Sequence, residues 1–182
     1  MSAIFPSHIF SGHFGKCHCQ GIAVDEKNGY IYYSFTTLLV KTDLEGNLIG
    51  TVDGLIGHLG CIAYNAGDGR VYGSLEFKND VIGRGILSAI GSAQSFEDAF
   101  YCAIFDVDRI DRIGMSAEGD GIMRAVYLSE VVADYKGVGE GGTGVLLVLF
   151  DLGQKHLALN EHKLARHNDK LGGKLHVHRL RL

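Results

Sequence analysis

The sequence predicts an all-β fold, and three observations support this class. First, the 18 residues that begin at His18 are repeated without gaps from His58, with six identical positions. Second, each copy alternates short apolar runs with polar turns that contain glycine, a pattern typical of antiparallel strands. Third, the chain of 182 residues has 26 glycines and one proline, which favours many tight turns.

The first copy predicts four strands separated by three turns. The run "GIAVD" is followed by "EKNG", in which Asn28-Gly29 is a hairpin signal. Further apolar and β-branched runs alternate with turns, and no apolar stripe with helical spacing is present. The predicted strands cover residues 21–25, 30–35, 38–43 and 48–52. Four antiparallel strands in a repeat of 40 residues are typical of a β-propeller blade.

The second copy predicts another blade, at about 58–114, with a long insertion. Its first strands are predicted at 60–64 and 70–75. The later stretch "FYCAIFDVDRIDRIG" resembles "LLVKTDLEGNLIG" of the first copy, so it predicts a third strand, a turn and a last strand before Gly114. The inserted loop covers 76–99, where Ser95 could cap a short helical turn.

The blade pattern stops in the last third of the chain. We expect a partial propeller domain over 1–150, with its first blade at about 18–55, and a separate basic, histidine-rich tail over 151–182. Residues 154–182 carry seven Lys or Arg, two acidic residues and five of the nine histidines. Because two blades cannot close a propeller, one hypothesis is a truncated or frameshifted piece of a longer propeller. An ordinary exposed basic tail is the equal alternative.

Composition restricts the partners that we expect. The net charge of −4, with 46% hydrophobic and 21% charged residues, indicates a globular protein without a basic surface for nucleic acid. The longest apolar stretch, "VLLVLF", is too short for a membrane span. The first residues do not resemble a signal peptide, and four cysteines are too few for a disulfide scaffold, so we expect a reduced, cytoplasmic protein.

The segment "GIAVDEKNGYIYYSFTTLLVKTDLEGNLIGTV" resembles the blades of NHL-type and SMP-30-like proteins. These families share the Gly-Ile-Ala-x-Asp start, a Gly-x-Ile/Leu-Tyr second strand and an Asp-containing turn before the last strand. The resemblance covers about 17–114 and implies a TolB-like propeller of about six blades. The expected core consists of Ile22, Ala23, Ile31, Ile62, Val71 and Ile104. Open blade faces would favour self-association.

The predicted site is the mouth of the propeller channel. In propellers, the loop that enters the innermost strand and the loop between the second and third strands share one face. On this basis we expect one polar ligand site formed by His18, His58, Thr36, Thr37, Glu76, Lys78, Asn79 and Asp80. A subset of these residues could hold Ca²⁺ or Zn²⁺, namely His18, His58, Glu76 and Asp80. The alternative, which we favour over metal binding, is that both histidines cap their blades.

The expected function is a propeller module that binds a small polar or sugar-like molecule. One alternative is an SMP-30-like hydrolase in which a metal ion activates water for attack on a lactone or ester. Another is an NHL-type scaffold that binds a protein partner. The sequence leaves open whether the protein is an enzyme.

Several further motifs are given structural interpretations. "CHC" at Cys17–Cys19, with Cys61, lacks a second close pair for zinc, so these cysteines are expected to be buried. "GVGEGG" at 137–142 lacks the helix that a phosphate loop needs, and "HVH" at 176–178 is assigned to the tail. The carboxylates of Asp106, Asp108 and Asp111 are assigned to turns and solvent.

Overall fold

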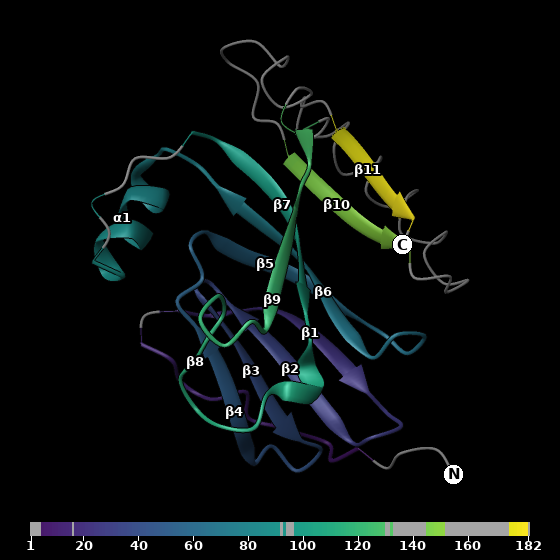
Figure 1. The fold of residues 1–182 in the computed structure, drawn as a ribbon. Coiled ribbons are helices and arrows are strands. Elements are labelled where there is room, and N and C mark those ends of the chain that lie inside the picture. Colours follow the sequence, from purple (N-terminus) through teal and green to yellow (C-terminus); the bar gives the residue numbers. More distant parts are fainter. Residues whose placement is uncertain are drawn as a thin grey trace. The chain divides into compact units, whose positions relative to one another are not determined.

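The computed structural model describes residues 5–15, 17–91, 93, 97–129, 132, 145–151 and 175–181. The chain divides into two compact units, Met1–Tyr127 and Leu128–Leu182, and each is described by itself. Strands predominate, which confirms the all-β class (Figure 1). Among the described residues, no helix has both the length and the apolar character needed to cross a membrane.

The first sheet is formed by the first sequence repeat. Its strands are β1 (Cys19–Asp25), β2 (Tyr30–Phe35), β3 (Leu38–Asp43) and β4 (Leu48–Asp53), each antiparallel to the next. All four lie within two residues of the predicted ranges. In the first turn, Gly29 has a φ of +74° and donates its N–H to the Asp25 carbonyl at 2.9 Å, so a side chain there would strain the turn.

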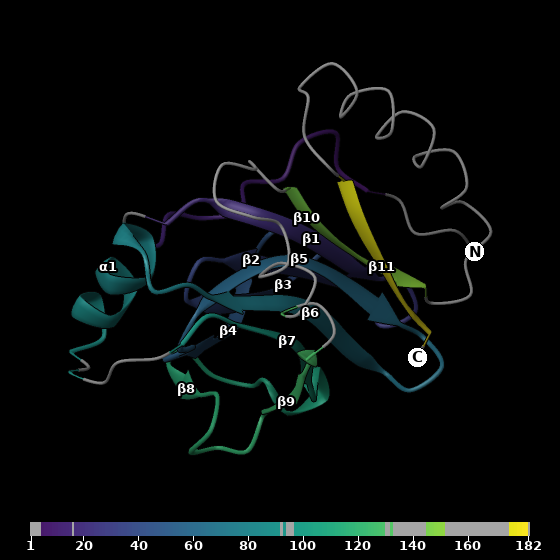
Figure 2. The same ribbon diagram turned by 90° about the horizontal axis from the view of Figure 1, so that it is seen from above.

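The second sheet is formed by the second repeat, again in antiparallel order. Its strands are β5 (His58–Asn65), β6 (Arg70–Phe77), β7 (Ala99–Phe105) and β9 (Met123–Tyr127). The insertion between β6 and β7 contains the helix α1 (Val81–Ala89), which lies to one side of the sheets (Figure 2). The first three strands agree with the prediction.

Two details of the second repeat differ from the prediction. The prediction of a last strand before Gly114 is wrong, because residues 107–109 form a short 3₁₀ helix and the fourth strand is β9. Between them, β8 (Met115–Ser116) leaves the second sheet and pairs in parallel with β4 of the first. The helix of the insertion begins after Asp80, whereas Ser95 lies outside the described residues.

The main core lies between the two sheets. On β6, Val71 and Leu75 point towards the first sheet, and Phe105 on β7 has the same orientation. The first sheet contributes Tyr32 on β2 and Leu39 on β3. All five side chains are buried, at 5% exposure or less. Burial of such apolar area is the principal stabilising term, at roughly 25 cal/mol per Å².

The sheets approach most closely where β1 passes β5. Ser34 is fully buried there, and its hydroxyl donates to the Gly60 carbonyl at 2.6 Å. A Cβ on Gly21 would lie 2.9 Å from the Ile62 nitrogen and 3.1 Å from the Cys61 Cα. Only a glycine allows the two backbones to lie this close.

The opposite face of the first sheet is covered by the N-terminal segment. Ile31, Tyr33 and Phe35 pack there against a group that includes Ile9 and Phe14. The two covers differ in extent, because a full sheet lies on one face and a short segment on the other. This difference explains why one predicted core residue is exposed to solvent.

The predicted core is confirmed for four of its six residues, which are Ala23, Ile31, Ile62 and Val71. Ile22 is a wrong prediction, because it is 58% exposed whereas its repeat counterpart Ile62 is 8% exposed. The side chain of Ile62 faces the first sheet, and that of Ile22 lies on the face covered only by the N-terminal segment. Ile104 is half-buried.

Polar side chains also lie inside the first unit. Lys41 is 4% exposed, and its ammonium group donates to the carbonyls of Val107 and Ile110 at 2.9 and 3.2 Å. Burial lowers the pKa of Lys41, and the nearby carboxylates of Asp108 and Asp25 act in the opposite direction.

Tyr32 is a different case. Its hydroxyl is buried and has no hydrogen-bond partner among the described residues. Burial raises the pKa of Tyr32, and the negative charge of Asp25 adds to the effect. The ring itself packs parallel to that of Tyr64, with centroids 6.0 Å apart.

Tyr32→Phe is therefore expected to keep the free energy of unfolding or to raise it by up to about 1 kcal/mol, because an unsatisfied hydroxyl is removed. The matched control is Tyr72→Phe at the equivalent position of the second repeat, where the hydroxyl donates to Asp68 at 2.5 Å. The free energy of unfolding of Tyr72→Phe should fall by about 1 kcal/mol. Urea denaturation of both variants measures the difference, and a larger loss for Tyr32→Phe would contradict the assignment.

In the described part of the second unit, β10 (Val145–Asp151) and β11 (Leu175–Arg181) pair in parallel. The histidines of "HVH" thus lie on a strand within the predicted tail, while residues 137–142 lie outside the described residues. All four cysteines are free. The expectation of buried cysteines is wrong for Cys61, which is exposed, whereas Cys17 and Cys19 are partly buried.

Candidate functional site

Register brings two of the predicted site residues together. His58 begins β5 and Glu76 lies near the end of β6, and the antiparallel pairing places the two residues directly opposite each other. The Nδ1 atom of His58 is 4.0 Å from Oε1 of Glu76. Their side chains are 27% and 35% exposed, so both can be reached from solvent.

The start of α1 positions the next two residues. Asp80 caps the helix, and its carboxylate accepts the Gly83 N–H at 2.9 Å. Gly83 is required at this point, because a Cβ there would overlap the carbonyl oxygen of Lys78. Asn79 is exposed, and its backbone N–H donates to the carboxylate of Asp98 at 2.8 Å. These contacts fix the chain from Lys78 to Asp80.

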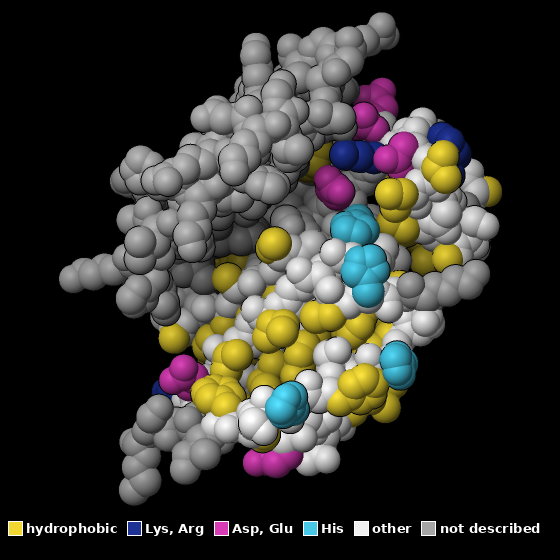
Figure 3. Space-filling model, turned by 180° about the vertical axis from the view of Figure 1, so that it is seen from behind, with side chains coloured by type: hydrophobic (Ala, Val, Ile, Leu, Met, Phe, Trp, Pro, Cys, Tyr) yellow, Lys and Arg dark blue, Asp and Glu magenta, His cyan; other side chains and the backbone are white. Residues whose placement is uncertain are grey.

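The result is a small pocket, called here the His58 pocket, with a volume of about 150 Å³. Its lining residues are His58, Glu76, Phe77, Lys78, Asp80, Ile82, Gly83 and Ile86. Four of these were predicted as site residues. The apolar floor from α1 was not predicted, although Asp80 followed by "VIGRGIL" is a helix start whose two glycines weaken the helical signal. Figure 3 shows histidine side chains beside acidic and basic ones on the side where α1 lies.

The other predicted residues lie outside this pocket. The carbonyl of Thr36 accepts the Leu59 N–H at 2.9 Å, and that of Thr37 accepts the Leu55 N–H at 3.3 Å. Through their backbones, Thr36 therefore connects the β2–β3 turn with β5, and Thr37 connects it with the chain before β5. His18 is exposed, and its Nε2 atom lies 2.8 Å from Nε2 of Gln20.

The metal ligands predicted from sequence are only partly brought together. His58, Glu76 and Asp80 line one pocket, and His18 does not. Within the part of the chain that the structure describes, no three His, Cys, Asp or Glu side chains form a group that could hold a metal ion. The metal assignment stays a prediction.

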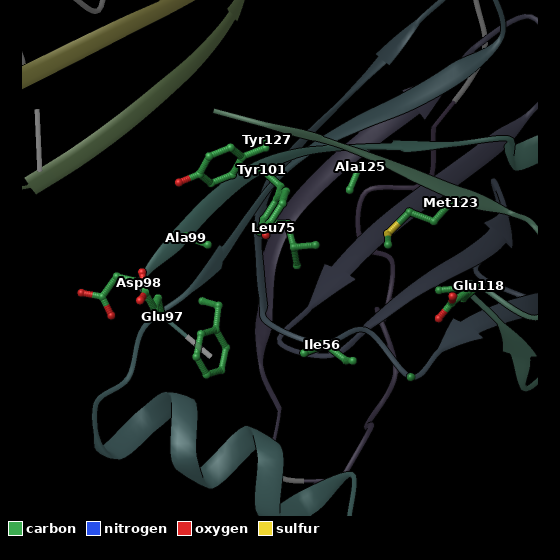
Figure 4. Close-up of a pocket in the computed structure, with 13 residues that line it drawn as sticks. Ile56, Leu75, Glu97, Asp98, Ala99, Tyr101, Glu118, Met123, Ala125 and Tyr127 are labelled. Carbon is green, nitrogen blue, oxygen red and sulfur yellow. The ribbon is translucent and has the colours of Figure 1, made fainter. Parts of the chain in front are cut away.

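A second, larger cavity was not predicted from sequence. It has a volume of about 450 Å³ and is called here the Tyr101 cavity. Its walls are the inner faces of β6, β7 and β9, the chain before β5 and the loop after β8 (Figure 4). The lining residues are Gly54, Ile56, Leu75, Phe77, Glu97, Asp98, Ala99, Tyr101, Ala117, Glu118, Met123, Ala125 and Tyr127. Phe77 lines both cavities.

Comparison of the chain with protein-family models and with curated protein sequences finds no significant match.

Proposed function

We propose that the chain contains two consecutive β-propeller blades and that the His58 pocket binds a small polar, sugar-like molecule. The two repeats form two sheets of the same strand order, and the NHL-type and SMP-30-like resemblance favours the same interpretation. What supports it most is the order in which the faces of the sheets pack.

The packing of the sheets is head-to-tail. The first sheet contacts the second through the face that carries Ser34. The second sheet contacts the first through the face that carries Leu75, which is not the face that corresponds to Ser34 in the repeat. Ser74, the repeat counterpart of Ser34, lies on the other face of β6, turned away from the first sheet. A further sheet could therefore be added by the same contact, and head-to-tail contacts close into rings when the rotation allows it.

The ligand class follows from the size and lining of the His58 pocket. A cavity of about 150 Å³ accommodates a molecule of benzene size, so it suits a single sugar ring or a smaller polyol and not an oligosaccharide. Imidazole, carboxylate and ammonium groups offer both donors and acceptors to hydroxyls. The apolar side chains of Phe77 and Ile86 can cover the C–H face of such a ring.

NMR titration with D-ribose and D-glucose tests this proposal. Saturable shifts are expected at the backbone amides of His58, Glu76 and Asp80. His58→Ala and Glu76→Ala should each weaken binding about fivefold or more, because each removes a hydrogen-bond partner worth about 1 kcal/mol.

Two histidines provide matched controls for the titration. His8 is exposed and lies outside the His58 pocket, so His8→Ala should leave binding unchanged. His18→Ala tests whether the predicted site extends beyond this pocket, and equal losses for His18→Ala and His58→Ala would favour the wider mouth. Absence of saturable shifts with both sugars would contradict the proposal.

A further inference from the structure

The Tyr101 cavity carries an inference that is independent of the His58 pocket. We propose that it binds an amphiphilic cation, meaning an amine joined to an aromatic or branched apolar body. The argument rests on three features of the cavity: its size, its apolar floor and the sign of its charges.

The size of the Tyr101 cavity suits a small organic molecule. Its volume of about 450 Å³ lies within the range of roughly 300–1,000 Å³ that is usual for ligand pockets. None of its lining residues belongs to β1 or β5, the strands at which the two sheets lie closest. The space is bounded by strands on one side, which hold their side chains in fixed positions.

The floor of the cavity is apolar and aromatic. Successive inward-facing residues of β7 and β9 place Tyr101 opposite Tyr127 and Ala103 opposite Ala125. The two tyrosine rings lie 5.4 Å apart with an interplanar angle of 52°. Leu75 and the tyrosines project into the same space in Figure 4. Such a surface favours an apolar or aromatic body, and tyrosine rings also attract cations.

The charge of the cavity has one sign. Glu97, Asp98 and Glu118 line it, and none of its thirteen lining residues is Lys, Arg or His. Among the described residues, the carboxylates of Glu97 and Glu118 have no hydrogen-bond or ion-pair partner. From the described part of the chain, the Asp98 carboxylate accepts the neutral N–H of Asn79 and no charged group. The two arginines of the neighbouring loop have other partners, since Arg112 pairs with Asp120 at 2.7 Å and Arg109 donates to the carbonyls of Gly121 and Asp120.

The positions of the acidic residues favour one orientation of a bound amine. Glu97 and Asp98 lie next to each other at one end of the floor, close to Ala99 and the tyrosines, and Glu118 lies at the other end (Figure 4). An ammonium group at the Glu97 end would leave its apolar body over Tyr101 and Leu75. A carboxylate of the same size would meet like charge at both ends and is disfavoured.

The test compares two ligands of similar size and opposite charge on the full chain. Phenethylamine is expected to bind with saturable NMR shifts at the amides of β7 and β9, and 3-phenylpropionate is expected to bind at least about tenfold more weakly. The preference should shrink at high salt, because salt screens the carboxylates. Equal binding of both probes, or no binding of phenethylamine, would overturn the proposal.

Variants separate the charge of the cavity from its shape. The double variant Glu97→Gln/Glu118→Gln should weaken phenethylamine binding about fivefold or more, while Glu45→Gln on an exposed turn should not. Ala125→Phe fills the cavity and should abolish binding, whereas Val126→Phe projects from the other face of β9 and should preserve it. Circular dichroism confirms that each variant is folded. Unchanged binding in both cavity variants would refute this site even if the amine binds elsewhere.

Sugar binding at the His58 pocket is unaffected by these changes if the two sites are separate. The two proposals can therefore fail independently.

Discussion

Replacing Asp25 with alanine is expected to lower the free energy of unfolding by about 3 kcal/mol at neutral pH. Asp25 is 1% exposed at the end of β1. Its carboxylate accepts the N–H groups of Lys27 and Asn28, both at 3.1 Å, and the side-chain amide of Asn28 at 2.7 Å. The Tyr64 side chain of the second sheet also helps to lower the pKa of this carboxylate. Loss of the carboxylate leaves these donors without their acceptor.

The pH dependence of this contribution follows from the pKa of Asp25. Burial acts to raise that pKa, but the hydrogen bonds from Asn28 and Lys27, together with the effect of the Tyr64 side chain, outweigh it, so the folded-state pKa is lowered. A lowered folded-state pKa means that the contribution is fully present above the unfolded-state pKa of about 3.9 and is lost as the pH falls through the folded-state value. The stability difference between the parent and Asp25→Asn should therefore be largest near neutral pH and shrink below about pH 4.

Urea unfolding at a series of pH values measures both effects. Asn65→Ala is the matched control, because Asn65 takes the place of Asp25 in the second repeat and accepts the Gly67 N–H at 3.0 Å in an exposed turn. Asn65→Ala should lower the free energy of unfolding by about 1 kcal/mol, and this decrease should not depend on pH. A decrease for Asp25→Ala no larger than this would show that the carboxylate does not stabilise the turn after β1.

The second large effect is expected at Gly21. Gly21→Ala should cost about 2 kcal/mol or more, because the new methyl group would press on the backbone of β5 and displace Ser34 from the Gly60 carbonyl. Gly85→Ala in α1 is the control, since nothing lies within 4 Å of a Cβ there. The free energy of unfolding of Gly85→Ala should rise by about 0.5–1 kcal/mol, because alanine has a higher helix propensity than glycine. Thermal or urea unfolding measures the stability of both variants. If both were more stable than the parent, or both less stable, the close contact would be disproved.

The first sheet could be predicted from sequence because every strand in it has a local signal. Each strand is a short apolar run, and turns such as Asn28-Gly29 separate the strands. The fourth strand of the second sheet has no such signal. The spacing of Ile110 and Ile113 imitates a strand, yet Ile110 is buried as part of a loop and Ile113 is 66% exposed. Contact with β4 decides the path of this loop, and that contact is long-range.

The same distinction explains what could be predicted of the sites. His58 and Glu76 face each other because two adjacent strands pair in register, which a repeat pattern and a hairpin predict. The role of Lys78 and Asp80 in the same pocket depends on α1, whose signal is weak. The Tyr101 cavity depends on the register of β9 against β7, and no local pattern encodes that register. The two histidines share a position in the repeat, but only His58 has Glu76 across the ladder.

The short strand β8 has a consequence for how the first unit unfolds. The chain leaves the second sheet after β7, lies along β4 and returns to form β9. The N–H of Thr51 donates to the Arg112 carbonyl at 3.1 Å, and the Gly114 N–H donates to the Thr51 hydroxyl at 2.8 Å. Met115 is buried in the shared core. Neither sheet can therefore lose its outer strands without exposing the other.

This crossing makes the two sheets a single cooperative unit, although the sequence presents them as separate repeats. Arrays in which each repeat contacts its neighbour only through a flat interface can unravel one repeat at a time. Here, the segment that returns to β4 couples the repeats covalently and through hydrogen bonds. It also requires contacts between residues distant in the chain before either sheet is complete, which slows folding relative to a fold built from local hairpins.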